Sequence, residues 1–500
     1  VGAIDGMLHA FNAGYYQRGD DTSTTGVIEH GRFTRDAGGG SSGALLGQEL
    51  WGFIPYQLLP QLRWLTQGDY THMYYVDLKP KVTDARIFTP DADHPGGWGT
   101  ILIGGMRMGG SCRGAVSPAA ATCTGSTGAP PMSVTADFGS GIQTRNFYSA
   151  YFVLDITNPE VNPKLLWVFT DESLGLTTSY PSIIRTSPAG SPKTDNTNAQ
   201  WFMVVGSGPT GYDGISSQTG QLFVMDLAKG PINPATGGSL LSKFPTSDAS
   251  SFMGNLISLD SELDFRTDVA YVGNNYNNGS APVWAGKMYR LMTRGCTAAP
   301  CTTNTWGVLS GGNRAPSVLL SSFPTAGTFK VGPTVAAPTV TSDDNGKIWE
   351  FFGSGRFFSN ADKTNTEQQY FFGVKDPVVT NGCVDSSITN CERKNILNVS
   401  SATVCVTCAG GTNQVTGIAG VTQLEGSATT TLQGLIQTMD GWYTTMPTSL
   451  ERVVVSPTIL GGIIYFPSFI PSTDICSASG TGNLYALFFL TGSAYKESVI

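Results

Sequence analysis

The sequence GQLFVMDLAKG, residues 220–230, shows the pattern that decides the fold of this chain. Apolar residues run unbroken from Leu222 to Met225, and small and charged residues typical of a turn follow. Similar phrases, GMLHAFNAG and GNLYALFFLTG, stand at residues 6–14 and 482–492. Short apolar runs bounded by glycines and turn residues predict β-strands. We therefore expect one kind of strand to recur from one end of the chain to the other.

The same pattern recurs between these phrases, for example in WGTILIGGMRMGG (98–110), WFMVVGSGPTGYD (201–213) and KIWEFFGSGRFF (347–358). Repetition at irregular intervals of roughly 50 to 80 residues is typical of a β-propeller with long loops. In a propeller both faces of each blade are covered, so inner strands such as 201–205 read as continuous apolar runs. A set of β-sandwiches is the alternative, but it would require linkers, and no linker composition is evident.

We expect an all-β fold, a β-propeller with long loop insertions, that forms a single domain over residues 1–500. The insertions are predicted at about 15–47, 111–140 and 381–437, where the chain is polar or rich in Ser, Thr and Gly. Charged residues make up only 13% of the 500 residues, about half the usual share. This composition favours strands joined by turns over long charged helices.

The charge distribution excludes one class of partner. The net charge is −8 and no basic block occurs, so a surface for nucleic-acid phosphates is not indicated.

The most apolar run, residues 459–470, is interrupted by Gly461, Gly462 and Pro467 and is too short to span a bilayer. Because the chain begins VGAIDG, within a strand-like motif, we expect it to be a fragment of a longer protein.

Cysteines occur in closely spaced pairs within Ser-, Thr- and Gly-rich segments. Short disulfide loops would fix such chain, which has little core of its own, and they indicate an oxidising compartment. The alternative is zinc, which needs two close ligand pairs, and the four histidines lie far from the C-x-x-C. Cys476 is left over and competes with Cys405 for Cys408 in an alternative pairing. The candidate disulfides are Cys112 with Cys123, Cys296 with Cys301, Cys383 with Cys391, and Cys405 with Cys408.

The acidic stretch DSELDFRTDVAYVG, residues 260–273, is the candidate metal site. Side-chain oxygens at alternate positions, with one backbone carbonyl, are the arrangement that calcium prefers. The predicted ligands are Asp260, Glu262, Asp264, the carbonyl of Arg266, and Asp268. A solvated acidic turn is the alternative, because Phe265 stands where calcium loops usually have Gly, and position 3 is a Glu.

Catalysis is not indicated by any convergent set of residues. All four histidines lie in the first hundred residues in unrelated contexts. The phrase DGMLHAFNAG, followed by GQELW, is close to the repeat of quinone-dependent dehydrogenase propellers, although the adjacent cysteines of those enzymes are absent. A carbohydrate-binding propeller using Trp51, Trp64 or Trp98 is a further alternative.

Arg18, Gly19 and Asp20 form an RGD triplet in the first polar insertion. Its functional interpretation is cell attachment, in which the Asp carboxylate completes a metal site on a receptor. Its structural interpretation is a surface turn, because Gly and Asp are common in polar turns.

Several phrases together resemble the C-terminal propeller of the PilY family of type IV pilus biogenesis factors and adhesins. They follow the family's order and cover nearly the whole chain. The phrases are AIDGMLHAFNAG (3–14), ELWGFIPYQLLPQLRWL (49–65), YTHMYYVDLKP (70–80), WGTILIGGMRMGG (98–110), FVLDITNP (152–159), LLWVFTD (165–171), GSGRFF (353–358), GWYTTMP (441–447) and ERVVVSPT (451–458).

This resemblance implies a modified seven-bladed propeller on an exported, non-enzymatic protein at the pilus tip or cell surface. It implies minor pilins and the tip complex as partners, with roles in pilus assembly against retraction, adhesion to host or abiotic surfaces, and twitching motility. It also implies a calcium loop, which falls on residues 260–268 of this chain.

Overall fold

The computed structural model describes most of the chain. The described residues are 1–3, 5–20, 26, 30–68, 70, 72–111, 131–194, 196–279, 283–310, 312–325, 327–377, 392–405, 407, 413–474 and 479–497. The chain forms two compact units, Val1–Glu172 with Ala228–Gly230, and Ser173–Leu227 with Pro231–Ile500. In the described residues, no helix has the length and apolar character that a membrane span needs.

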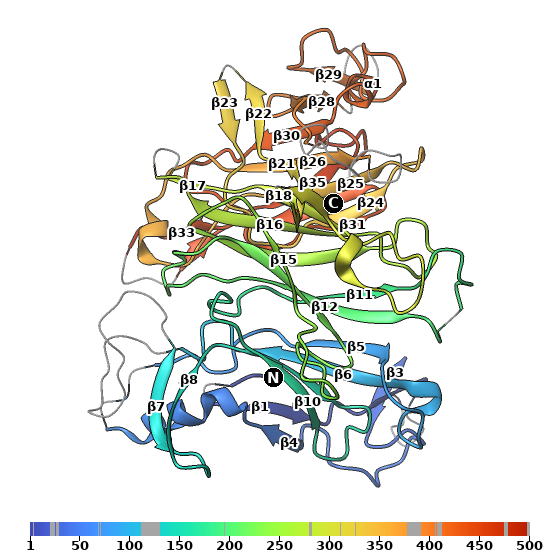
Figure 1. Cartoon of the computed structure of the whole chain (residues 1–500). Coiled ribbons are helices and arrows are strands. Elements are labelled where there is room, and N and C mark those ends of the chain that lie inside the picture. The colour runs from blue at the N-terminus through green and yellow to red at the C-terminus, as the bar shows by residue number, and fades with distance from the viewer. Residues whose placement is uncertain are drawn as a thin grey trace. The chain divides into compact units, whose positions relative to one another are not determined.

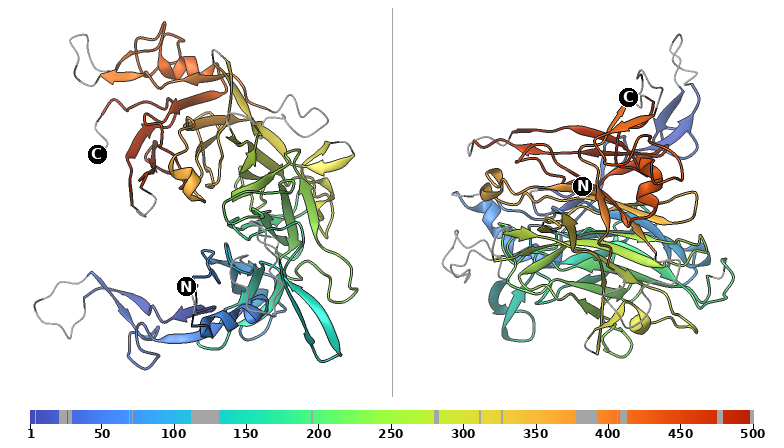
Figure 2. Two further views of the ribbon diagram at one scale, coloured as in Figure 1. Left: turned by 90° about the vertical axis from the view of Figure 1, so that its left-hand side faces the viewer. Right: turned by 90° about the horizontal axis from the view of Figure 1, so that it is seen from above.

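Unit 1 is built around the four-stranded antiparallel sheet β10-β9-β6-β5 (Figure 1). The hairpin β7–β8 extends away from this sheet (Figure 2, cyan). The core of unit 1 includes Trp51, Trp64, Phe152 and Leu154. The elements are β1 (Leu8–Phe11) paired with β4 (Glu49–Phe53), β2 (Tyr15–Arg18) with β3 (Gly31–Thr34), β5 (Lys81–Arg86), β6 (Trp98–Gly105), β7 (Met132–Asp137) with β8 (Ile142–Phe147), β9 (Tyr151–Asp155), β10 (Lys164–Phe169), and the 3-10 helices η1 (Tyr56–Thr66) and η2 (Pro95–Gly97).

Unit 2 contains three larger sheets and one smaller sheet, which follow one another along the chain. The first has the order β11 (Ser182–Thr186), β12 (Gln200–Gly206), β13 (Gln221–Asp226), β14 (Ser242–Pro245). The second has the order β15 (Ser251–Leu259), β16 (Val269–Asn277), β18 (Met288–Met292), β21 (Ser317–Leu320), and β17 (Trp284–Ala285) also pairs with β16. The third has the order β24 (Thr339–Ser342), β25 (Ile348–Gly353), β26 (Tyr370–Asp376), β30 (Gly441–Thr445), β27 (Ile396–Asn398). The fourth has the order β31 (Thr458–Leu460), β32 (Ile463–Pro467), β35 (Leu484–Phe488).

Short hairpins and single helical turns complete unit 2. The hairpin β28–β29 lies beside the helix α1 (Figure 1). The elements are β19 (Val308–Ser310) with β20 (Asn313–Ala315), β22 (Ser322–Thr325) with β23 (Gly327–Lys330), β28 (Thr403–Cys405) with β29 (Gln414–Thr416), β33 (Ile470–Pro471) with β34 (Gly480–Thr481), η3 (Thr303–Thr305), η4 (Asn360–Lys363) and α1 (Leu432–Gln437).

Successive sheets of unit 2 pack face to face. Phe202 and Val204 of the first sheet share a cluster with Val272 of the second. The other face of the second sheet packs on the third, whose outer face packs on the fourth, again through buried aromatic and aliphatic side chains. Both faces of the central sheets are therefore covered. This is why their strands read as continuous apolar runs, and it is the packing of propeller blades.

The predicted insertions contain ordered elements of their own. Insertion 15–47 contains the hairpin β2–β3, and the described part of insertion 381–437 contains β27, β28, β29 and α1. In insertion 111–140, β7 starts at Met132, while residues 112–130 lie outside the described residues. The assignment of residues 1–500 to a single domain stays a prediction.

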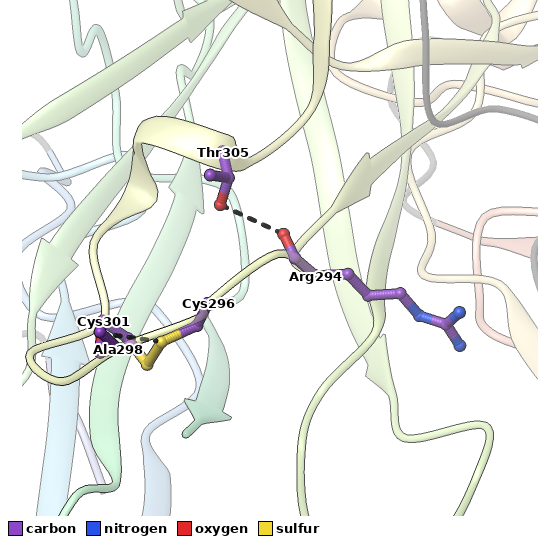
Figure 3. The surroundings of a disulfide bond; sticks show 5 residues. All are labelled: Arg294, Cys296, Ala298, Cys301 and Thr305. Carbon is purple, nitrogen blue, oxygen red and sulfur yellow. Dashed lines mark hydrogen bonds between the residues drawn. A yellow bond between two sulfur atoms is a disulfide. The ribbon is translucent and has the colours of Figure 1, made fainter. Parts of the chain in front are cut away.

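One predicted disulfide is confirmed. Cys296 and Cys301 are bonded, with 5.3 Å between their Cα atoms (Figure 3). Cys405 is also disulfide-bonded. The other candidates, Cys112, Cys123, Cys383, Cys391 and Cys408, and the unassigned Cys476, lie outside the described residues.

Candidate metal centre

The acidic loop, residues 260–268, connects the neighbouring antiparallel strands β15 and β16. The strand ends Leu259 and Val269 face each other directly, so the loop is closed at its base. The chain turns at Leu263 (φ 53°) and Phe265 (φ 62°), both in the left-handed region. Phe265 therefore adopts the conformation for which calcium loops usually have Gly, and its side chain is 62% exposed.

Backbone amides bind the first predicted ligand. The Asp260 carboxylate accepts hydrogen bonds from the amides of Asp264 (3.1 Å) and Phe265 (2.7 Å). The Asp264 carboxylate accepts from the amide of Arg266 (2.9 Å) and also pairs with the Arg266 guanidinium. These bonds close the loop on itself and hold both carboxylates at fixed positions.

The last predicted ligand, Asp268, is the most buried acidic residue of the loop, at 5% exposure. One carboxylate oxygen accepts from the amide (2.8 Å) and the hydroxyl (2.6 Å) of Ser261. The other oxygen accepts from Nε of Arg294 at 2.8 Å. Arg294 also binds Glu262, with 2.8 Å between Nη2 and Oε1. Burial lowers the pKa of Arg294, but its hydrogen bond with Asp268 and the charges of Asp268 and Glu262 outweigh burial and raise it.

Cationic side chains also bind the backbone of the loop. Lys193 donates to the carbonyl of Leu263 at 2.7 Å, and Arg185 donates to the carbonyl of Phe265. Within the part of the chain that is described, the carbonyl of Arg266, which is the predicted backbone ligand, accepts no hydrogen bond. A cavity of about 180 Å³ lies beside the loop, and its wall includes Glu262, Asp268 and Arg294. A cavity of about 290 Å³ lies elsewhere in unit 2.

The predicted ligands lie in one loop, as the spacing requires, but they do not form a coordination shell in this structure. Among the described residues, no three His, Cys, Asp or Glu side chains stand together as a metal would need. The carboxylates of Glu262, Asp264 and Asp268 pair with arginines instead. The structure therefore shows an acidic loop whose charge is neutralised by cationic side chains of the same chain.

Arg294 contacts the loop from outside the loop sequence, as Arg185 and Lys193 do, and it is the outside residue that pairs with the loop carboxylates. It lies just after β18, and β18 pairs with β16 so that Met292 faces Val269. This register brings Arg294 to Asp268. In the sequence, this contact was indicated only by an arginine at the end of a strand-like run, GKMYRLMTR (286–294). Its partner could be identified only once the strand pairing was known.

The RGD triplet lies in unit 1, at the end of the hairpin β2–β3. Arg18 is the last residue of β2, Gly19 has φ 103°, and the side chains of Arg18 and Asp20 are exposed. The carbonyl of Asp20 accepts from Arg32 at 2.8 Å. The hairpin thus presents the triplet on the surface.

Comparisons with known proteins agree on one group. No protein-family model matches the chain. A type IV pilus biogenesis factor PilY1 homolog of Xylella fastidiosa is 26% identical over 98% of this chain and 29% of its own length. Type IV pilus biogenesis factor PilY1 of Pseudomonas aeruginosa is 23% identical over 100% of this chain and 36% of its own length. The crystal structure of the Pseudomonas aeruginosa PilY1 C-terminal domain is similar with a TM-score of 0.56 and 19% identity, over 99% of this chain and 79% of that chain.

The predicted resemblance to the PilY family is confirmed. The structural likeness shows the fold, so the expected all-β propeller class is also confirmed. This chain spans only about a third of the curated relatives, between 29% and 36% of the two compared above. The activity and partners of a whole PilY-type protein are therefore not established for this chain by likeness alone.

Proposed function

We propose that this chain is the propeller of a type IV pilus biogenesis factor and that it acts as a binding platform without catalytic turnover. The observation that carries this proposal is the likeness to PilY1 proteins over 98% to 100% of the chain. Covered, tightly packed sheets with loops at their ends suit a platform, because loops carry binding residues on a rigid scaffold. The partners would be minor pilins and the pilus tip complex, outside the cell.

Neither alternative from the sequence is favoured. The relatives are named as pilus biogenesis factors, which suggests a role other than quinone-dependent oxidation. Of the tryptophans considered for a carbohydrate site, Trp51 and Trp64 are buried in the core of unit 1.

The test is deletion of the segment that encodes this chain from its gene in the source bacterium. We expect surface pili to be lost, as measured by pilin in the fraction sheared from cells. If the chain opposes retraction, pili return when the retraction ATPase is also deleted. Normal piliation after the first deletion would contradict the proposal.

The adhesive role extends this proposal to the surface of unit 1. Asp20 carries the carboxylate of the RGD triplet, and its side chain is exposed. Asp20→Asn removes the negative charge with little change of shape. We expect the variant to bind integrin-bearing cells less well than the unchanged chain, and soluble RGD peptide to compete only with the latter. Equal binding of the variant and the unchanged chain would indicate that the triplet is only a surface turn.

The proposal also includes regulation of the chain by calcium. Three features support it: the alternating oxygens of residues 260–268, the left-handed turns at Leu263 and Phe265, and the carbonyl of Arg266, which accepts no hydrogen bond from any described residue. The carboxylates that pair with arginines would have to be released first. Binding to the folded chain alone raises its stability with the logarithm of calcium concentration. A melting temperature that is the same in calcium and in chelator would favour the solvated turn.

A further inference from the structure

Two neighbouring cavities of unit 2, of about 290 Å³ and 240 Å³, share two lysines in their walls. Lys347 lies just before β25 and Lys375 lies near the end of β26, and these strands pair so that Trp349 faces Lys375. The larger cavity also has Arg393 in its wall. Cationic side chains from three places in the sequence therefore line one space.

Lys375 is buried without a counter-charge, at 8% exposure. Its ammonium group donates to the carbonyls of Ile436 (2.8 Å) and Gln437 (3.1 Å), at the end of α1. An ammonium group has three donors, and among the described residues the third has no partner and Lys375 forms no ion pair. A buried charge without an opposite charge is unfavourable, so an anion bound here would stabilise it.

Lys347 adds a second positive charge to the same wall. Its side chain is exposed, and within the described part of the chain its ammonium group has no hydrogen-bond or ion-pair partner. Burial and the charge of Lys347 lower the pKa of Lys375 to about 8, although the charges of Asp440 and Asp343 oppose the shift. Two ammonium groups in one wall repel each other, and an anion between them would remove that repulsion.

The carboxylates that line the two cavities do not neutralise these lysines. Among the described lining residues there are four, and the fourth, Asp344, is exposed to solvent. The other three are bound to other donors of the chain, in the pairs Asp376 with Arg290, Asp440 with Arg393, and Asp343 with Nε1 of Trp349. Two positive charges therefore stay without a paired carboxylate at the shared wall.

The larger cavity is also lined by the apolar side chains of Pro377 and Met439. Apolar wall beside two cations favours an organic anion over an inorganic one, because a carbon skeleton covers the apolar surface while its acidic groups meet the ammonium groups. We propose that Lys347 and Lys375 form a binding site for a dicarboxylate. The two carboxylates come either from a free dicarboxylic acid or from two neighbouring acidic residues of a peptide.

The experiment titrates the whole 500-residue chain with succinate, with the peptide acetyl-Gly-Asp-Asp-Gly-amide and with inorganic phosphate, by isothermal titration calorimetry. The variants are Lys347→Met and Lys375→Met, which lose the charge but keep an extended side chain. Lys243→Met is the matched control, because Lys243 is exposed in the first sheet of unit 2 and donates to the Ser173 hydroxyl at 3.3 Å. Lys347→Met leaves the contacts with α1 intact, so it serves if Lys375→Met does not fold.

We expect the unchanged chain to bind succinate or the acidic peptide, and each of the two lysine variants to bind at least about tenfold more weakly, because each loses a charge-assisted contact. Lys243→Met should match the unchanged chain. Tighter binding of the peptide would identify a protein as the source of the carboxylates, and tighter binding of succinate would identify a free acid.

The pH dependence gives a second readout. Binding should weaken as the pH rises above about 8, because Lys375 then loses its proton, and Lys375→Met should lack this dependence. Absence of binding by both dicarboxylates would overturn the inference, as would phosphate binding as tight as that of the better dicarboxylate. An equal loss of affinity in Lys243→Met would also overturn it, since the attraction would then come from the overall charge and not from this site.

Discussion

Among the described carboxyl groups, Glu350 has the most unusual environment. It is fully buried between the second and third sheets of unit 2, and within the described part of the chain neither of its oxygens has a hydrogen-bond partner. Nearby, Arg290 pairs with Asp376, and the Tyr271 hydroxyl donates to Asp376 at 2.9 Å. Burial, together with the charge of Asp376, raises the pKa of Glu350 well above its usual 4.5, although Arg290 opposes the shift.

The sign of the resulting pH dependence is set by proton binding. The folded chain keeps the Glu350 proton over a range in which the unfolded chain has lost it. Its contribution to stability is therefore complete below pH 4.5 and is lost as the pH rises through the raised pKa. Glu350→Gln should remove this loss. The free energy of unfolding of the variant, relative to that of the unchanged chain, should therefore increase as the pH rises. Urea unfolding at several pH values checks this, and parallel pH profiles would show that Glu350 is already ionised in the fold.

Gly206 provides a second prediction at the same scale. A Cβ added there would lie 2.3 Å from Cβ of Met253, the residue that packs against it from the second sheet. Gly206→Ala should therefore lower the free energy of unfolding by about 1–3 kcal/mol, because the sheets must move apart. Gly68→Ala is the control, since nothing lies within 4 Å of the added atom and no unusual φ is required there. Equal unfolding curves for the two variants would show that the sheets can adjust.

At the scale of elements, the loop after β25 joins parts of unit 2 that are distant in sequence. Arg356 pairs with Asp362 at 2.7 Å, donates to the carbonyls of Asp213 (2.6 Å) and Gly214 (3.2 Å), and lies 3.5 Å from the ring centre of Trp284. Its side chain is 4% exposed. Removal of one partner of a buried ion pair leaves the other charge without compensation.

Arg356→Ala should therefore lower the free energy of unfolding by about 3–5 kcal/mol, as measured by urea denaturation. Arg356→Lys keeps the charge but cannot reach the same carbonyls and carboxylate together. We expect Lys to recover only part of the loss. Complete recovery by Lys would mean that the charge alone, and not the planar group, joins these loops.

The elements also show how far the sequence predicts the structure. The apolar runs became strands where expected, and GQELWGFIPYQLLPQLRWL (47–65) became β4 followed by η1, because local periodicity reports which faces are buried. The acidic stretch became the loop between β15 and β16. Its contacts with Arg185 and Arg294 were not predicted, because they depend on which strands pair and in what register. Spacing within the loop carries no information on those partners.

At the scale of the whole molecule, this chain differs in length from the PilY1 relatives that it resembles. The two comparisons reported above cover 98% and 100% of this chain but only 29% and 36% of those relatives. If pilus assembly depends on the propeller alone, this chain is sufficient for it. If attachment depends on parts of the relatives that this chain does not match, the chain is not sufficient for attachment.

Expression of the 500 residues with a secretion signal, in a source strain from which the gene that encodes this chain is deleted, separates these roles. We expect sheared pilin to return to a large part of its normal amount, while attachment to surfaces stays well below normal. The same chain with Arg356→Ala should restore less pilin, because its fold is weaker. Secreted chain is quantified in parallel, so that poor export is not taken for lost function. Absence of pili despite normal secretion would mean that these 500 residues do not support assembly by themselves, since a folded platform would then be present without effect.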